Sequence, residues 1–259
     1  MIYARYILRV TLGLILSIQS GLNLVYASED KNIVVFGASG RIGEVVVIEA
    51  LERGYKVKGV SRKPEKLVFE DQNFTSVKGD LKDIVSIRDA INNSDAVVIS
   101  VSARAPDNKP ENSMLVEFTR NLIEVVSAME NKPYIVQVGG ANLMYGATYE
   151  EVKSNMHNAP FSYEKGTAMH AVLFGHQISV ELYRASGLPW TVIAPPMRIL
   201  GIYGELDRST SRPSFRISDT EALVAEDGSK TVYVRDLARA LVNEIEEKQF
   251  SGKIFNVAY

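Results

Sequence analysis

The chain has 259 residues, an apolar fraction of 46%, a formal net charge of −2 and no cysteine. This amount of apolar sequence is enough for one sizeable core, and the balanced charge argues against a nucleic-acid partner. The absence of cysteine excludes disulfides and metal–thiolate sites.

The first 27 residues have the layout of a secretory signal peptide. Arg5 and Arg9 precede an apolar run at residues 10–18, and small residues stand before a cleavage site expected after Ala27. We therefore expect residues 28–259 to form one domain, periplasmic or secreted, without membrane contact after cleavage. An uncleaved membrane anchor and an organellar presequence are the alternatives, because the segment contains arginines and no acidic residue.

A glycine-rich stretch follows an apolar run at residues 33–36, which is typical of a strand buried on both faces. A helical pattern begins at once after the glycines. A strand that turns through glycines into a helix binds anions well, because the first helical N–H groups have no partner inside the helix. The spacing G-x-x-G-x-x-G therefore predicts a dinucleotide pyrophosphate site, with a turn that binds no ligand as the alternative. Its residues are Gly37, Ala38, Ser39, Gly40, Arg41, Ile42 and Gly43.

The second strand, expected at residues 55–60, ends at Ser61 and Arg62. In a dinucleotide fold this end faces the adenosine ribose, where an acidic residue would bind the 2′-hydroxyl of NAD. Residues 59–63 contain no acid, and Arg62 beside Ser61 and Lys63 suits a 2′-phosphate instead. We therefore predict NADP(H) as the cofactor, with NAD(H) less favoured; a solvated loop cation is the alternative.

The rest of the chain alternates apolar runs with helical patterns. Such an alternation implies right-handed crossovers and a parallel sheet. We expect an α/β fold of the Rossmann type, a doubly wound parallel sheet in a single domain with a small C-terminal substrate cap at residues 197–227. Residues 143–166 are expected to be a loop. Further strands are expected at residues 74–78, 95–101, 134–138, 190–194, 230–234 and 253–257, and further helices at 83–91, 111–129, 167–185 and 236–246.

Three later motifs add to the glycine stretch: Ser-Gly-Leu-Pro-Trp-Thr at residues 186–191, Pro195-Pro196, and Gly-Ser-Lys-Thr-Val-Tyr-Val-Arg-Asp at residues 228–236. Together they resemble the atypical short-chain dehydrogenase/reductase group. Within it the chain is similar to the NAD(P)H-binding, NmrA-like family, which includes NADH-flavin reductases and biliverdin reductase B. The resemblance covers nearly all of residues 31–259.

The resemblance implies a cofactor on the carboxyl ends of the strands, in agreement with the general rule for open α/β sheets. Residues 38–43 would meet the pyrophosphate, and Arg62 the 2′-phosphate. The remaining implied binding residues are Ser61 at the same strand end, Asp80 and Leu81 beside the adenine, Ser102 and Arg104 along the ribose and phosphates, and Gly139, Pro195 and Pro196 near the nicotinamide.

The chain departs from the superfamily at the catalytic tyrosine and lysine. Their positions fall on Val172 and His176, and Gly139-Gly140 stands in place of the serine. A Tyr-x-x-x-Lys pair occurs at Tyr149 and Lys153, in the expected loop, where chance is the simpler explanation. The catalytic residues are thus unknown, with His176, Tyr149 and Lys153 as candidates. His176 is placed to hydrogen-bond the nicotinamide ribose, and a surface or internally satisfied histidine is the alternative.

Two other groups of side chains lie near these candidates. His170 is six residues from His176, so the two point to different helix faces and predict no metal site. Four aromatic residues suit the walls of a planar substrate site, with ordinary loop packing as the alternative. They are Tyr145, Tyr149, Phe161 and Tyr163.

We predict an NADP(H)-dependent oxidoreductase that transfers hydride to a planar, flavin- or quinone-like acceptor or to a carbonyl. The resembling branch commonly lacks the tyrosine–lysine pair. Flavins tolerate that loss, because they take hydride at nitrogen and a proton from solvent. A non-catalytic NAD(P)-binding redox sensor or assembly factor is the alternative. The expected partner is a small-molecule substrate.

Overall fold

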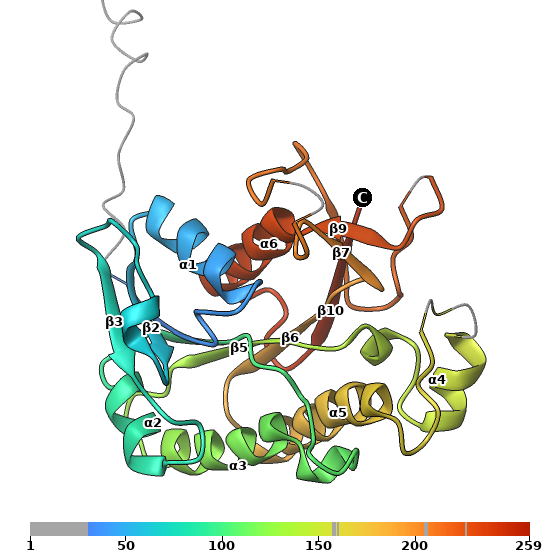
Figure 1. The fold of residues 1–259 in the computed structure, drawn as a ribbon, viewed down its shortest axis with the longest axis horizontal. Helices are drawn as coiled ribbons and strands as arrows, with labels where there is room; N and C mark the ends of the chain where they lie inside the picture. The colour runs from blue at the N-terminus through green and yellow to red at the C-terminus, as the bar shows by residue number, and fades with distance from the viewer. Residues whose placement is uncertain (1–30, 157–158, 160, 205–206, 226) are drawn as a thin grey trace, which may run out of the picture. The chain divides into compact units, whose positions relative to one another are not determined.

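A mostly parallel sheet of eight strands runs through the centre of the protein (Figure 1). A computed structural model describes residues 31–156, 159, 161–204, 207–225 and 227–259, and the expected signal peptide lies outside these residues. The strand order is β3-β2-β1-β4-β5-β6-β10-β8, and only β8 is antiparallel to its neighbour. The bounds are β1 Asn32–Phe36, β2 Lys56–Ser61, β3 Phe74–Lys78, β4 Ala96–Ile99, β5 Tyr134–Val138, β6 Trp190–Ala194, β8 Arg216–Ser218 and β10 Ile254–Ala258.

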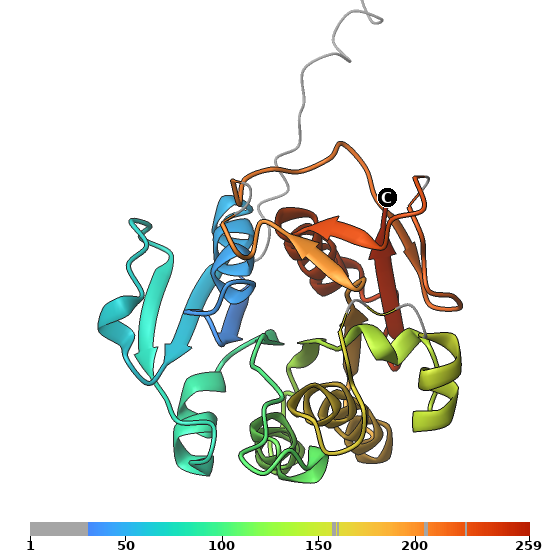
Figure 2. The same cartoon turned by 45° about the vertical axis from the view of Figure 1, so that its right-hand side comes forward.

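Helices cover both faces of the sheet (Figures 1 and 2). On one face, α1 (Gly43–Glu52) packs against α6 (Val234–Glu247), and on the other α2 (Ile84–Ile91), α3 (Met114–Ser127) and α5 (Ala168–Ser186) lie in a row. Each layer has its own apolar core against the sheet. Burial of the central strands on both faces explains why they are continuous apolar runs rather than alternating patterns. The predicted Rossmann-type doubly wound fold is confirmed.

The strand order reverses between β1 and β4, where the crossovers change side. In open α/β sheets this switch point opens a crevice outside the carboxyl ends of the strands, because the connections on the two sides diverge. The glycine loop follows β1 directly. The fold therefore places the predicted pyrophosphate loop at the switch point.

The prediction of a plain loop at residues 143–166 is wrong. A 3₁₀ turn, η3 (Ala141–Met144), and a helix, α4 (Tyr149–Asn155), lie there. Thr148 and Glu151 begin α4 with a reciprocal capping box, in which each side chain accepts a hydrogen bond from the backbone of the other residue. The helix is short, so its sequence shows too few turns to establish a period.

The C-terminal cap also contains more structure than its sequence predicts. Within residues 197–227, β7 (Arg198–Leu200) pairs with β9 (Thr231–Tyr233), and β8 joins the edge of the main sheet. The strand β9 agrees with the one expected at residues 230–234, whereas β7 and β8 were not predicted, because each is three residues long and too short to show an alternation.

The motif at residues 228–236 ends in a buried ionic contact. Asp236, in the first turn of α6, is fully buried and accepts hydrogen bonds from the Tyr259 hydroxyl at 2.6 Å, the Arg212 N–H at 2.8 Å and the Arg239 guanidinium at 2.8 Å. It therefore joins α6, the cap and the C-terminal residue. In the described part of the chain, no helix has both the length and the apolar character to cross a membrane.

Candidate cofactor site

The strand register brings the predicted site residues to one level at the carboxyl edge of the sheet. Phe36 at the end of β1 is paired with Val60 of β2 and Ile99 of β4. The residues that follow these three therefore lie side by side. Ser61 is paired in turn with Lys78, so the loop after β3 joins the same group. Phe36 and Ile99 are 63 residues apart in the sequence, and the parallel topology brings them together.

Glycine is required in the first loop because the backbone segments approach too closely for a side chain. Gly37 has a φ of 84°, and a methyl group there would lie 2.3 Å from the carbonyl oxygen of Ser100. A methyl group on Gly43 would lie 2.2 Å from the Gly37 carbonyl oxygen. Gly37 thus makes the tight turn and fits against β4, while Gly43 lets α1 begin directly against the loop, as the fingerprint predicts.

The N-terminus of α1 is open to a ligand. Its N-cap residue, Ile42, makes no side-chain hydrogen bond to the first turn, whereas Asp83, Ser113, Thr148 and Thr167 cap α2, α3, α4 and α5. The Glu44 N–H donates to the Gly40 carbonyl at 2.9 Å, so part of the first turn is satisfied by the glycine loop, and the helix dipole favours an anion beside the rest of this turn. This end of α1 is therefore suited to a phosphate group.

A cleft of about 750 Å³ lies over this edge of the sheet. Half of the predicted binding residues line it: Gly37, Ser39, Gly40, Ser61, Arg62, Asp80, Leu81 and Ser102. Further lining residues, which were not assigned to the site from the sequence, are Val60, Lys63, Lys66, Gly79, Lys82, Ser100, Val101 and Met114. Its size and the convergence of backbone and polar groups are typical of a ligand site.

The cleft is cationic at the end of β2. Arg62, Lys63 and Lys66 are exposed, and none of them forms an ion pair with another described residue. Lys82 instead pairs with Glu117 at 2.9 Å. Lys66 reaches the cleft because Pro64 starts a 3₁₀ turn, η1 (Pro64–Lys66), directly after the strand. Its position four residues after Arg62 was the available sequence signal.

Other predicted residues of the loops lie around the cleft rather than along it. Ala38 is fully buried under the glycine loop. Arg41 is exposed, and its guanidinium lies 4.6 Å from the ring centre of Tyr203 in the cap. Ile42 and Gly43 form the start of α1. Arg104 is exposed two residues beyond Ser102 and does not line the cleft.

The residues predicted near the nicotinamide lie at the ends of β5 and β6. Gly139 donates its N–H to the Ile193 carbonyl at 2.8 Å, and Pro195 and Pro196 are buried beyond it. None of the three lines the cleft. A methyl group on Gly139 would lie 2.6 Å from Cδ1 of Leu143, so η3 packs directly on this strand end.

Tyr149 and Lys153 lie together on α4, at the exposed side of the protein. The Tyr149 hydroxyl donates to Glu164 at 2.7 Å, and Lys153 forms an ion pair with the same carboxylate at 3.5 Å. The hydrogen bond to Glu164 raises the pKa of Tyr149, with burial as a smaller cause. Neither residue lines the cleft. A proton donor needs a pKa near the working pH, so this arrangement does not favour acid catalysis by Tyr149.

His176 lies on the inner face of α5, with 7% of its surface exposed. Burial lowers its pKa to about 4, so the imidazole is neutral at pH 7. Nδ1 is buried and has no hydrogen-bond partner in the described chain. Val172, at the position of the superfamily tyrosine, is partly buried and packs against the apolar core of this layer.

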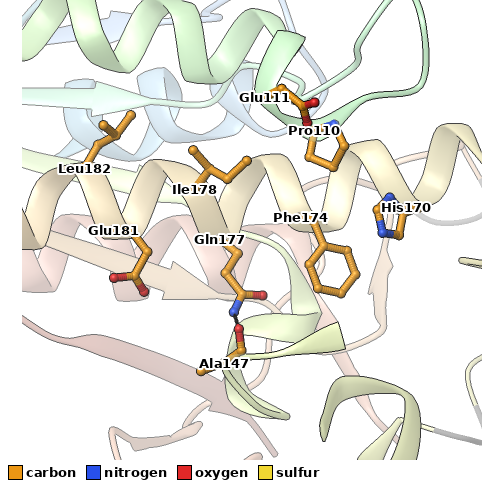
Figure 3. A pocket seen from close by; sticks show the side chains of 9 residues that line it. All are labelled: Pro110, Glu111, Ala147, His170, Phe174, Gln177, Ile178, Glu181 and Leu182. Atoms are coloured by element: carbon orange, nitrogen blue, oxygen red, sulfur yellow. Dashed lines mark hydrogen bonds between the residues drawn. The ribbon is translucent and has the colours of Figure 1, made fainter. Parts of the chain in front are cut away.

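His170 and the predicted aromatic group lie on the outer side of α5 and around α4. His170 stacks on Phe174 at 4.7 Å between ring centres and lines a shallow pocket of about 610 Å³ along this helix (Figure 3). In Figure 3 the Gln177 side chain reaches across to the Ala147 carbonyl. Tyr163 is buried in a separate small core with Tyr145, Tyr149 and Phe161 against it. These contacts match the loop-packing alternative for the aromatic group.

A family model of NAD(P)H-binding proteins matches residues 37–248. The chain belongs to this NAD(P)H-binding family. Cinnamoyl-CoA reductase 1 of rice (Oryza sativa subsp. japonica) is 26% identical over 87% of this chain and 70% of its own length. This membership establishes a nicotinamide-cofactor fold of the oxidoreductase kind and confirms the resemblance drawn from the sequence.

Two solved structures show similar folds. A provisionally described exported protein of Burkholderia pseudomallei has 25% identity and a TM-score of 0.66, over 88% of this chain and 100% of its own. A provisionally described NADH-flavin reductase of Streptococcus pneumoniae has 21% identity and a TM-score of 0.67, over 88% and 98%. Within the described ranges, no three histidine or acidic side chains are grouped so that they could hold a metal ion.

Proposed function

We propose that the protein is an NADP(H)-dependent reductase that transfers hydride to a planar, flavin- or quinone-like acceptor. The observation that carries this proposal is the cleft at the switch point, where Arg62, Lys63 and Lys66 stand without ionic partners opposite the open end of α1. A nicotinamide dinucleotide with a 2′-phosphate carries negative charge at both of these places. The family membership supports the same type of cofactor.

Different residues of the cleft fit different parts of such a cofactor. The N-terminus of α1, which has no side-chain cap, would hold the pyrophosphate, and Gly40, whose N–H donates to the Gly37 carbonyl at 2.8 Å, would let the backbone approach it closely. Arg62 and Lys66 would bind the 2′-phosphate, Arg62 through two donors in one plane. Leu81 would pack against the adenine. When bound, the nicotinamide supplies a hydride, which the acceptor receives together with a proton from solvent.

We choose a planar acceptor because neither Val172 nor His176 on the helix α5 is a good proton donor. Val172 has no proton to give, and His176 is held neutral by burial, so neither is a good acid. Reduction of a simple ketone needs a proton at the oxygen as hydride arrives, and a general acid typically contributes roughly 10²–10⁴-fold. A flavin or quinone spreads the added charge over a conjugated system, so it depends less on a protein acid.

The test is NADPH oxidation by the purified full chain with riboflavin or a naphthoquinone, compared with cyclohexanone. We expect turnover with the planar acceptors and at least roughly 100-fold lower kcat/KM with the ketone. Tyr149→Phe should leave the flavin rate within twofold. Loss of activity in this variant would show that Tyr149 and Lys153 are the acid pair. Tight NADPH binding without reduction of any acceptor would favour the non-catalytic sensor instead.

A further inference from the structure

Two buried polar side chains meet beside Gly140, at the carboxyl end of β5. A methyl group on Gly140 would lie 2.5 Å from Oδ1 of Asn142 and 3.2 Å from Cδ2 of His176. Asn142 comes from η3, and His176 comes from α5. Both side chains therefore pack around the same glycine, next to the strand end where the sequence predicts the nicotinamide. The single polar side chain after three small residues, Gly139-Gly140-Ala141, was the sequence signal for Asn142.

These side chains are left without hydrogen bonds by the rest of the protein. Asn142 is fully buried, and neither its Nδ2 nor its Oδ1 has a partner among the described residues. Nδ1 of His176 is also buried and has no hydrogen-bond partner among the described residues. Three unsatisfied buried atoms on two side chains that pack around the same glycine are unusual, because each costs about 1–3 kcal/mol and native proteins pair most such groups. A partner from outside the chain is the economical explanation.

The neutral character of this pair distinguishes it from the cleft. An asparagine amide carries no charge, and burial alone lowers the pKa of His176, without any charged neighbour as a cause. The free cations are instead at the end of β2, on Arg62, Lys63 and Lys66. A charged ligand group beside Asn142 and His176 would be desolvated without compensation, which is strongly unfavourable.

We propose that Asn142 and His176 form a neutral hydrogen-bonding subsite that takes an uncharged carboxamide, carbonyl or imide group of the bound ligand. This proposal rests on the proposed function, since it places the reacting end of the ligand at β5. An amide in this position both donates and accepts, which matches the donor and acceptor pattern of those groups. Two sources carry this chemistry, the nicotinamide carboxamide and the acceptor. Carboxylate-bearing acceptors such as 2-oxo acids are excluded.

The first arm of the test is ligand binding by Asn142→Leu. Leucine has a side chain of similar shape to asparagine but no amide group. Binding is measured for NADPH and for adenosine 2′,5′-bisphosphate, which carries the charged half without a nicotinamide. We expect unchanged affinity for the bisphosphate. If the nicotinamide is the source, NADPH affinity falls roughly 5- to 10-fold; if the acceptor is the source, its KM rises by a similar factor at unchanged NADPH affinity. Asn142→Asp should show the same loss, because it adds a charge.

The second arm is thermal unfolding of the ligand-free protein, with Asn256→Leu as the matched control. Asn256 is buried like Asn142, but its amide is satisfied, donating to Ala194 and accepting from Leu223, both at 2.8 Å. Asn256→Leu should therefore lower Tm. Asn142→Leu should leave Tm unchanged or raise it, because an amide whose hydrogen-bond partner is the ligand does not stabilise the ligand-free protein.

Three results would overturn the proposal. The first is unchanged NADPH affinity together with unchanged KM for every acceptor that the wild type reduces. The second is an equal loss of NADPH and bisphosphate affinity, which would indicate a structural role. The third is a fall in Tm as large as that of the control, which would assign the amide to buried structural water. If the wild type reduces no acceptor, the proposed function fails, and unchanged NADPH affinity in Asn142→Leu alone then overturns the subsite.

Discussion

Burial determines the protonation of His176. Charging an imidazole with 7% of its surface exposed costs solvation free energy, and no carboxylate offsets this cost. The unfolded chain takes up a proton there near pH 6.5, whereas the folded imidazole does so only near pH 4. Folding therefore opposes protonation throughout this interval, and the neutral imidazole is the form that would meet the proposed ligand.

This difference predicts how stability depends on pH. The stability associated with neutral His176 is fully present above about pH 6.5 and is lost as the pH falls towards 4, because the unfolded state binds the extra proton. The loss approaches about 1.4 kcal/mol per pH unit and about 3 kcal/mol in total. Urea unfolding at pH 7, 5.5 and 4.5 measures it. Between pH 6.5 and 4, the free energy of unfolding of His176→Gln should fall less than that of the wild type, by this amount. An equal dependence of the free energy of unfolding on pH in both proteins would contradict the prediction.

At the scale of elements, the buried carboxylate of Asp236 joins the first turn of α6 to the cap and to Tyr259, and a second buried carboxylate, Glu244, accepts from the Tyr134 hydroxyl further along the helix. Asp236 pairs with Arg239 and also accepts from the Tyr259 hydroxyl and the Arg212 backbone. Removing one partner of a buried charged network leaves the other groups unpaired in a low-dielectric environment. The start of α6, the cap and the chain end should therefore lose stability together.

We predict that Asp236→Ala lowers the free energy of unfolding by about 3 kcal/mol or more. Asp89→Ala, at an exposed position of α2, is the matched control and should change it by less than about 0.5 kcal/mol. Chemical denaturation of both variants checks this. Similar small effects in the two proteins would show that the Asp236 contacts are not energetically important.

The longer elements could be predicted from the sequence, and of the three-residue strands only β9 was predicted, at residues 230–234. The strands β1 to β6 and the helices α1, α2, α3, α5 and α6 follow from apolar runs and helical periods. Helix α4 and the three-residue strands β7 and β8 offer too few repeats, and the Thr-x-x-Glu spacing of Thr148 and Glu151 was the available sequence signal for α4, which the loop prediction did not use.

The same contrast holds for the candidate site. Gly37 and Arg62, directly after β1 and β2, were predicted from the glycine spacing and from the strand end that faces the ribose, and Leu81 was implied by the family resemblance. Lys66 and Asn142 were missed because a 3₁₀ turn carries each of them to the site, and the period of such a turn is not visible in three or four residues.

At the scale of the whole molecule, the site divides into a cationic end at β2 and a neutral end at β5. Arg62, Lys63 and Lys66 line the cleft, and the unpaired amide of Asn142 lies beside Gly140 with the His176 ring. One ligand with phosphates at one end and an uncharged ring at the other satisfies both. The order of the strands thus sets the direction in which such a ligand would lie.

The N-terminal segment leads to a separate prediction for the whole chain. We predict that native expression yields a mature protein beginning at Ser28, outside the cytoplasm. Mass spectrometry of the purified protein from each cell fraction gives both the N-terminus and any bound nucleotide. An intact Met1 in the cytosolic fraction would contradict the prediction.

The most direct measurement of the central claim is the affinity of wild type and Arg62→Ala for NADPH and NADH. Arg62 is exposed at the end of β2 and has no ionic partner in the described chain, so its substitution removes little else. We expect the wild type to prefer NADPH. Arg62→Ala should lose about 1.5–3 kcal/mol for NADPH, roughly 10- to 150-fold in Kd, and almost nothing for NADH. Arg88→Ala, an exposed arginine on α2, is the control and should bind both cofactors as the wild type does. Equal losses for NADPH and NADH in Arg62→Ala would contradict a 2′-phosphate site in this cleft.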